Sequence, residues 1–128
     1  MNDMRQPWTA EDERIQAFVS RACAGDIGAM RAQVAAGFNL NGTDRFGDTI
    51  LERVISDLEF CSETPKYEVV KEMLRLGADP HALSKDGSSP LIVAVLNMDT
   101  EMLRILLDAG ADPNAVRMHS SDELLYDW

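Results

Sequence analysis

Gly77-Ala78-Asp79-Pro80 recurs as Gly110-Ala111-Asp112-Pro113, and the two copies are 33 residues apart. A fixed period of this length is typical of repeat proteins, in which one supersecondary unit stacks on copies of itself. Such a unit cannot bury its apolar face alone, so the neighbouring units complete the core. The sequence therefore predicts a stack of similar units whose function lies on an extended surface.

The most regular unit opens at Asp86-Gly87, a pair that predicts a tight turn. Ser89-Pro90 then predicts the start of a short, mostly buried helix, because Ser can cap the first free amides and Pro suits the first helical position. Asp99 predicts the N-cap of a second helix over residues 100–109. Gly110 is expected to end that helix in a left-handed conformation. The unit is thus a turn, a helix, a loop and a second helix.

This unit resembles an ankyrin repeat. Residues 86–91 match the opening of the family's pattern, a turn glycine followed by Thr-Pro-Leu-His, with Ser89 in place of the Thr and Ile92 in place of the His. Residues 105–115 match its closing pattern, Leu-Leu-x-x-Gly-Ala-Asp-x-Asn, without a gap. The resemblance implies an all-α fold, a short ankyrin-repeat solenoid of stacked helix-turn-helix units with turn or hairpin connections.

Two looser copies precede this unit. The resemblance implies that the three units together form one ankyrin-repeat domain over residues 1–128. Thr9 is expected to cap the first helix, with acidic residues following it near the positive helix end. After residue 115 the pattern begins again and stops, so either a short capping helix or a truncated further repeat is expected. The approximate boundaries are 9–41, 42–82 and 83–115 for the repeats and 120–128 for the partial cap.

The second unit is longer than the period, because 40 residues separate Gly47 from Gly87. Aligning both ends places a seven-residue insertion between its helices, within about residues 57–64. Thr64-Pro65 is expected to restart the chain as a helix with the same cap as Ser89-Pro90. An insertion in a loop leaves the stacked core intact.

The chain is acidic, with 22 Asp and Glu residues against 12 Lys and Arg residues and a formal net charge of −10. This balance argues against binding a nucleic-acid backbone, which requires clustered basic residues. It would suit a basic protein partner through electrostatic steering. Solubility alone is the other explanation of the charge.

Cys23 and Cys61 form neither a disulfide framework nor a metal-binding set, so we expect small apolar side chains in or near packed helices. No apolar run approaches the roughly 20 residues that span a bilayer. The polar N-terminus carries no apolar signal segment. These features predict a cytoplasmic location without membrane association.

Catalytic and cofactor-binding motifs are absent from the sequence. His81 and His119 have no metal-ligand spacing and suggest no nucleophile–base pair. The glycines do not form a phosphate-binding array. The acidic residues of the insertion lack the ligand spacing of a calcium loop. We therefore predict a protein that is not an enzyme and holds no cofactor or metal.

The resemblance implies that the turn tips and first helices line a concave groove that binds other proteins. Phe46 suggests a binding hot spot, because aromatic residues are enriched there, but it could instead pack beneath its turn. Phe60 could bind a partner or fold back onto helix ends, and Tyr126 and Trp128 could bind a partner or seal the last repeat. The protein-binding candidates are Asp44, Arg45, Phe46, Glu52, Arg53, Ser56, Phe60, Lys85, Asp86, Val93, Asn97, Arg117 and Met118.

These observations together predict a monomeric, noncatalytic module that recognises a partner protein through its concave face. A narrower hypothesis is an inhibitor that covers the active surface of a basic partner, since small acidic ankyrin proteins resemble those used as immunity proteins against secreted bacterial toxins. The alternative is a structural scaffold or assembly subunit with no inhibitory role.

Overall fold

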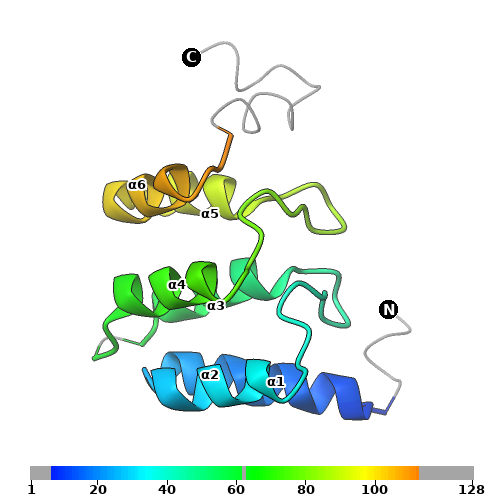
Figure 1. The fold of residues 1–128 in the computed structure, drawn as a ribbon. Coiled ribbons are helices and arrows are strands. Elements are labelled where there is room, and N and C mark those ends of the chain that lie inside the picture. Colours follow the sequence, from blue (N-terminus) through cyan, green and yellow to red (C-terminus); the bar gives the residue numbers. More distant parts are fainter. Residues whose placement is uncertain (1–6, 62, 113–128) are drawn as a thin grey trace.

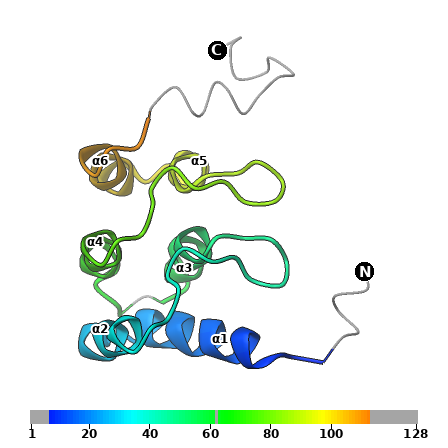
Figure 2. The same ribbon diagram turned by 45° about the vertical axis from the view of Figure 1, so that its right-hand side comes forward.

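Helices stacked in pairs make up the computed structural model, which describes residues 7–61 and 63–112 (Figure 1). One column contains the first helix of each pair and the other contains the second helix (Figure 2). Apart from an isolated antiparallel bridge between Thr43 and Thr49, the described part contains helices and turns without a strand. The predicted all-α repeat solenoid is therefore confirmed. The pairs are α1 (Ala10–Cys23) with α2 (Ile27–Ala35), α3 (Ile50–Leu58) with α4 (Lys66–Arg75), and α5 (Pro90–Leu96) with α6 (Thr100–Asp108).

The predicted helix caps follow from local side-chain chemistry. The Ser89 hydroxyl accepts a hydrogen bond from the Ile92 amide at 3.2 Å and starts α5. The Asp99 carboxylate accepts one from the Met102 amide at 3.1 Å and starts α6. Thr9 caps α1 as predicted, as part of a reciprocal capping box. These bonds satisfy amides that have no partner within the helix itself.

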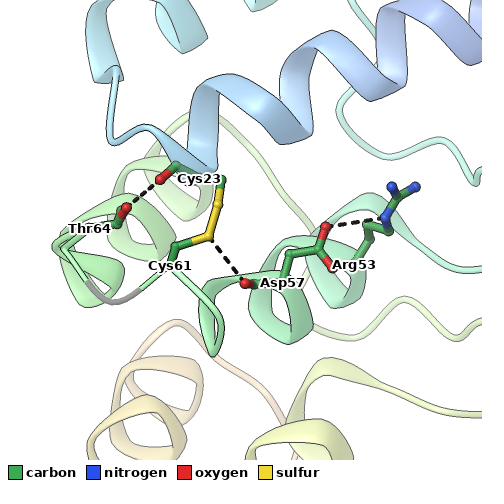
Figure 3. The surroundings of a disulfide bond; sticks show 5 residues. All are labelled: Cys23, Arg53, Asp57, Cys61 and Thr64. Atoms are coloured by element: carbon green, nitrogen blue, oxygen red, sulfur yellow. Dashed lines mark hydrogen bonds and ion pairs between the residues drawn. A yellow bond between two sulfur atoms is a disulfide. The ribbon is translucent and has the colours of Figure 1, made fainter.

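One predicted cap is wrong. Helix α4 begins at Lys66, and its N-cap residue Pro65 makes no side-chain capping bond. The hydroxyl of Thr64 instead donates to the backbone carbonyl of Cys23, at the end of α1 (Figure 3). Thr64 therefore joins two repeats, an interaction that its local sequence could not reveal.

The core runs continuously through the stack. Helix α3 packs against α1 on one side and α5 on the other, while α4 packs against α6. Phe18 is fully buried, and its ring stacks on Phe38 with 5.0 Å between the ring centroids. Met73 and Leu106 are also fully buried, in the second and third pairs. Burying a large apolar side chain contributes about 1.5–3 kcal/mol, so each pair depends on its neighbours for stability.

The insertion lies where the sequence places it, between the helices of the second pair. Helix α3 has nine residues whereas α5 has seven. The connection after α3 covers residues 59–65, whereas the one after α5 covers only 97–99. Both changes lie at the end of α3 and in the connection to α4, on one side of the stack, so the packed part of the second repeat keeps the regular arrangement.

A disulfide joins Cys23 at the end of α1 to Cys61 in the insertion (Figure 3). Their Cα atoms are 5.9 Å apart, although 38 positions separate them in the sequence. The expectation of two unpaired, core-like cysteines is therefore wrong. Stacking of the first two repeats brings the residues together, and this long-range contact has no signature in their spacing.

Several sequence predictions fall outside the described residues. They concern the binding candidates Arg117 and Met118, the neighbouring His119, and the capping helix over 120–128. Within the part that the structure describes, none of the helices is long and apolar enough to cross a membrane.

Glu72 on α4 connects the second helices of the first two pairs, because it forms an ion pair with Arg31 on α2. Its side chain is only 4% exposed, and its carboxylate lies 2.7 Å from Arg31 Nε on α2. The other carboxylate oxygen lies 2.6 Å from Arg75 Nη1 on α4. The hydrogen bond from Arg31 lowers the pKa of Glu72 most, with burial acting in the opposite direction and Arg75 adding to the lowering. The charged form of Glu72 therefore stabilises the contact between the first two repeats.

We expect Glu72→Gln to lower the melting temperature at pH 7 and to reduce its dependence on pH. A carboxyl pKa that folding lowers contributes stability above the unfolded value of 4.5, and this contribution is lost as pH falls through the folded value. The difference in melting temperature between wild type and Glu72→Gln should therefore become smaller as the pH falls. Thermal unfolding followed by circular dichroism from pH 7 to pH 3 measures it.

The matched control is Glu68→Gln, because Glu68 lies on the same helix, is 58% exposed and pairs with Lys71 on the surface. Exposed pairs of this kind contribute little. A Glu72→Gln variant with the same pH profile as wild type would contradict the predicted role.

Candidate functional site

Two turn tips, residues 43–48 and 83–88, project on the same side of the stack next to α3 and α5 (Figure 2). The Lys85 amide donates to the Gly47 carbonyl at 2.8 Å, so the tips are joined through their backbones. In the first tip, the Asp44 carboxylate accepts from the Phe46 and Asp48 amides at 2.9 and 3.0 Å. The two tips therefore form one continuous edge.

Beside this edge lies a depression of about 300 Å³. It runs from the tips onto the first helices, α3 and α5, where the Glu52 side chain is buried and Ser56 is exposed. We call this depression the groove pocket. Its lining residues are Asp48, Glu52, Arg53, Ser56, Asp57, Asp86, Ser88 and Val93.

The one arginine of the groove pocket is held by groups of the chain itself. The Arg53 guanidinium donates to the Gln16 side chain on α1 at 2.9 Å. It also lies 3.3 Å from the Asp44 carboxylate and 3.5 Å from the Asp57 carboxylate. These contacts neutralise Arg53 and fix its position, so it holds α1, the first tip and α3 together.

Three other carboxylates give the groove pocket its charge. Burial raises the pKa of Asp48 and of Glu52, and the nearby Asp86 carboxylate raises both further. Hydrogen bonds from Ser88 and Thr49 oppose this effect at Glu52, and the Thr49 hydroxyl lies 3.2 Å from the Glu52 carboxylate. A cation placed here would relieve the repulsion among the carboxylates. Across residues 7–61 and 63–112, no group of three His, Cys, Asp or Glu side chains forms a metal site.

The predicted binding residues of the first tip differ in accessibility. Asp44 is 9% exposed and is used within its own turn. The Arg45 side chain is 12% exposed, lies 3.7 Å from the Asp12 carboxylate and sits over the Trp8 ring at 5.2 Å. Phe46 is 48% exposed. Of these three, Phe46 is therefore the side chain most available to a partner.

Helices α3 and α5 bring the groove candidates Glu52, Arg53, Ser56 and Val93 together, and the second tip adds Asp86. Lys85, also in the second tip, is exposed beside this group. Most of the predicted groove residues thus share one surface.

Two candidates lie elsewhere, on the connections between the paired helices. Asn97 lines a separate depression of about 360 Å³ together with Glu59 and Lys66. Phe60 is 87% exposed, so it does not fold back onto the helix ends. These two residues belong to a different surface from the groove pocket.

Sequence reasoning missed Asp48, Asp57 and Ser88 as lining residues. Asp48 and Ser88 each follow the turn glycine of their repeat, so comparing the two repeats position by position could have found both. In the sequence, Asp57 is one of the acidic residues of the insertion, which lack the ligand spacing of a calcium loop. Its place in the groove pocket depends on the extended α3, whose length no local sequence pattern indicates.

Helix pairs stacked in register, with an edge of tips beside a groove, define the class of helical repeat proteins that bind along an extended surface. The ankyrin-repeat family model matches residues 86–117. The chain is 29% identical over 99 residues to the putative ankyrin repeat protein YahD of Escherichia coli (strain K12), a match that covers 77% of this chain and 46% of YahD. It is 34% identical over 86 residues to human ankyrin repeat and SOCS box protein 6, covering 62% of this chain and 19% of that protein.

A solved ankyrin repeat domain from Acinetobacter baumannii AYE superposes with a TM-score of 0.61 and 32% sequence identity. That match covers 75% of this chain and 48% of the solved chain. The chain belongs to the ankyrin-repeat family, whose repeats generally mediate protein–protein interaction. In each of these comparisons it spans less than half the length of the relative.

Proposed function

We propose that this chain is a noncatalytic module that binds a partner protein through the tips and the groove pocket, and that the partner places a basic side chain on the groove carboxylates. The observation that carries the proposal is the grouping of Asp48, Glu52 and Asp86 beside an arginine already neutralised by its own neighbours. The exposed ring of Phe46 adds an apolar contact at the edge. The chain's net charge of −10 would also favour encounter with a basic surface.

Glu52 is the residue that best separates binding from stability. Its raised pKa means that the folded state binds a proton more tightly than the unfolded state does. Ionised Glu52 therefore opposes folding, and stability from this group rises as pH falls through the folded pKa. Gln at this position keeps an oxygen that can accept the Thr49 hydrogen bond and removes the charge.

We expect Glu52→Gln to leave the melting temperature at pH 7 unchanged or to raise it. The same change should weaken the binding of the partner by about tenfold or more. The partner is to be captured from source cells, identified by mass spectrometry, purified, and titrated against both forms by calorimetry. Glu68→Gln serves as the control, since it removes an exposed carboxylate from α4, outside the groove pocket. Equal binding by wild type and Glu52→Gln would place the interface elsewhere.

The inhibitor hypothesis is the narrower form of this proposal, in which the partner is a basic toxin or enzyme and the chain is its inhibitor or immunity protein. The acidic groove pocket and the net charge support it. A purified partner whose activity stays constant when the chain is added in excess would exclude inhibition. The scaffold alternative predicts a stable assembly, and light scattering distinguishes that assembly from the monomer we propose.

A further inference from the structure

The insertion is fastened to the first repeat at two neighbouring points. Cys61 is bonded to Cys23, and the Thr64 hydroxyl donates to the Cys23 carbonyl (Figure 3). Both attachments lie on the inserted connection between α3 and α4, a stretch that the regular repeats do not have. Cys23 and Cys61 are half-buried rather than enclosed, so a reductant can approach them.

Cys61 also lies just after the end of α3, the helix that carries several residues of the groove pocket. The Phe60 amide donates to the Asp57 carbonyl at 2.9 Å, and the Cys61 amide donates to the Leu58 carbonyl at 3.1 Å. The Cys61 sulfur lies 3.3 Å from the Asp57 carbonyl oxygen. The disulfide therefore anchors the turn that closes α3.

The side chain of Asp57 points the other way, to Arg53. Its carboxylate lies 3.5 Å from Arg53 Nε, and both residues line the groove pocket (Figure 3). A continuous path of contacts thus leads from the disulfide through Asp57 to Arg53. If the last turn of α3 loosens, Asp57 moves away and Arg53 becomes less neutralised, which disfavours a basic ligand.

We infer that the Cys23–Cys61 disulfide is a redox-sensitive lock that holds the end of α3 and, through Asp57 and Arg53, sets the charge of the groove pocket. The effect on binding of a basic ligand rests on the proposed function, whereas the effect on the last turn of α3 does not. The reductant is a dithiol, either a small molecule or a protein with two neighbouring cysteines. One of its thiolates attacks a sulfur of the disulfide and forms a mixed disulfide, which its second thiolate then resolves. Cys23 and Cys61 end as thiols, each with one proton, and the dithiol ends as a disulfide.

The first measurement is hydrogen exchange of the oxidised and the dithiothreitol-reduced protein. We expect reduction to speed exchange of the Phe60 and Cys61 amides by about tenfold or more. The buried amides of α6 should exchange at an unchanged rate, because the third repeat can open while the first two stay folded. The Cys23→Ser, Cys61→Ser double variant should behave as the reduced protein does, with or without reductant, and its far-ultraviolet circular dichroism checks that it folds. Maleimide labelling of the denatured, unreduced wild type should find no free thiol.

The second measurement is the affinity of a fluorescein-labelled oligolysine peptide for each form, with oligoglutamate as the charge control. We expect reduction to weaken oligolysine binding by a factor between about 2 and about 30. Free thiols in the unreduced protein, or equal exchange at Phe60 and Cys61 in both forms, would overturn the lock. Equal peptide binding despite faster exchange would overturn its coupling to the groove pocket. Failure of the oxidised protein to prefer oligolysine would count against the basic-partner proposal alone.

Discussion

Gly47→Ala is expected to lower the free energy of unfolding by about 3 kcal/mol, because two costs add at this position. Gly47 has a φ of +88°, in the left-handed region that disfavours residues with a Cβ. A Cβ placed there would also lie 2.5 Å from the Lys85 Cβ, which has no freedom to rotate away. Relief of this overlap must separate the two tips, whose backbones are joined at the same point. Urea unfolding followed by circular dichroism measures the loss.

Gly37→Ala is the matched control. Gly37 has a φ of +107°, but a Cβ there would meet no atom within 4 Å. We expect this variant to show only the conformational cost, about 1–2 kcal/mol. The difference between the two variants then reports the overlap of Gly47 with Lys85. Equal losses in the two variants would mean that the tips are not packed as the structure has them.

Removing the disulfide is expected to cost about 2–4 kcal/mol of stability. The bond closes a loop with a sequence separation of 38, which restricts the unfolded chain more than the folded one. The change can be made by adding dithiothreitol or by replacing both cysteines with Ser. The midpoint of guanidinium unfolding should shift to lower denaturant in both cases.

The Cys23→Ser, Cys61→Ser variant supplies the control, since dithiothreitol should not shift its unfolding midpoint further. Single replacements are less informative, because they leave a free thiol that can form bonds between molecules. A wild-type midpoint that is the same with and without reductant would contradict the expected contribution of the bond.

The sequence predicted the repeats and most helix ends because these depend on neighbouring residues. Ser89 and Asp99 cap helices that begin one residue later, so their chemistry is visible in a short window. Thr64 has the same local pattern as Ser89, but its hydroxyl bonds across the stack to Cys23. Local reasoning cannot foresee a partner that only tertiary packing brings near.

The candidate binding surface was predictable to a lesser degree for a similar reason. Repeat position placed Glu52 and Val93 on one face beside the tips, and both line the groove pocket. It could not reveal that Arg45 and Arg53 are held by carboxylates of the same chain. Asp12 reaches Arg45 from the first repeat, and Asp44 reaches Arg53 from the tip of the same repeat, so the packing of the chain decides whether each arginine is available to a partner. The disulfide between Cys23 and Cys61 could not be predicted because the two cysteines belong to different repeats.

The bond between Cys23 and Cys61 also decides how this protein would respond to mechanical tension. A pull on the two chain ends passes from α1 through the sulfur atoms to the inserted connection and bypasses everything between them. Helix α2, the first tip and α3 lie within the bypassed segment and bear no load while the bond is intact. The third repeat has no such bypass. Tension would therefore act on α1, α4, α5 and α6, and the acidic half of the groove pocket on α3 would be shielded from it.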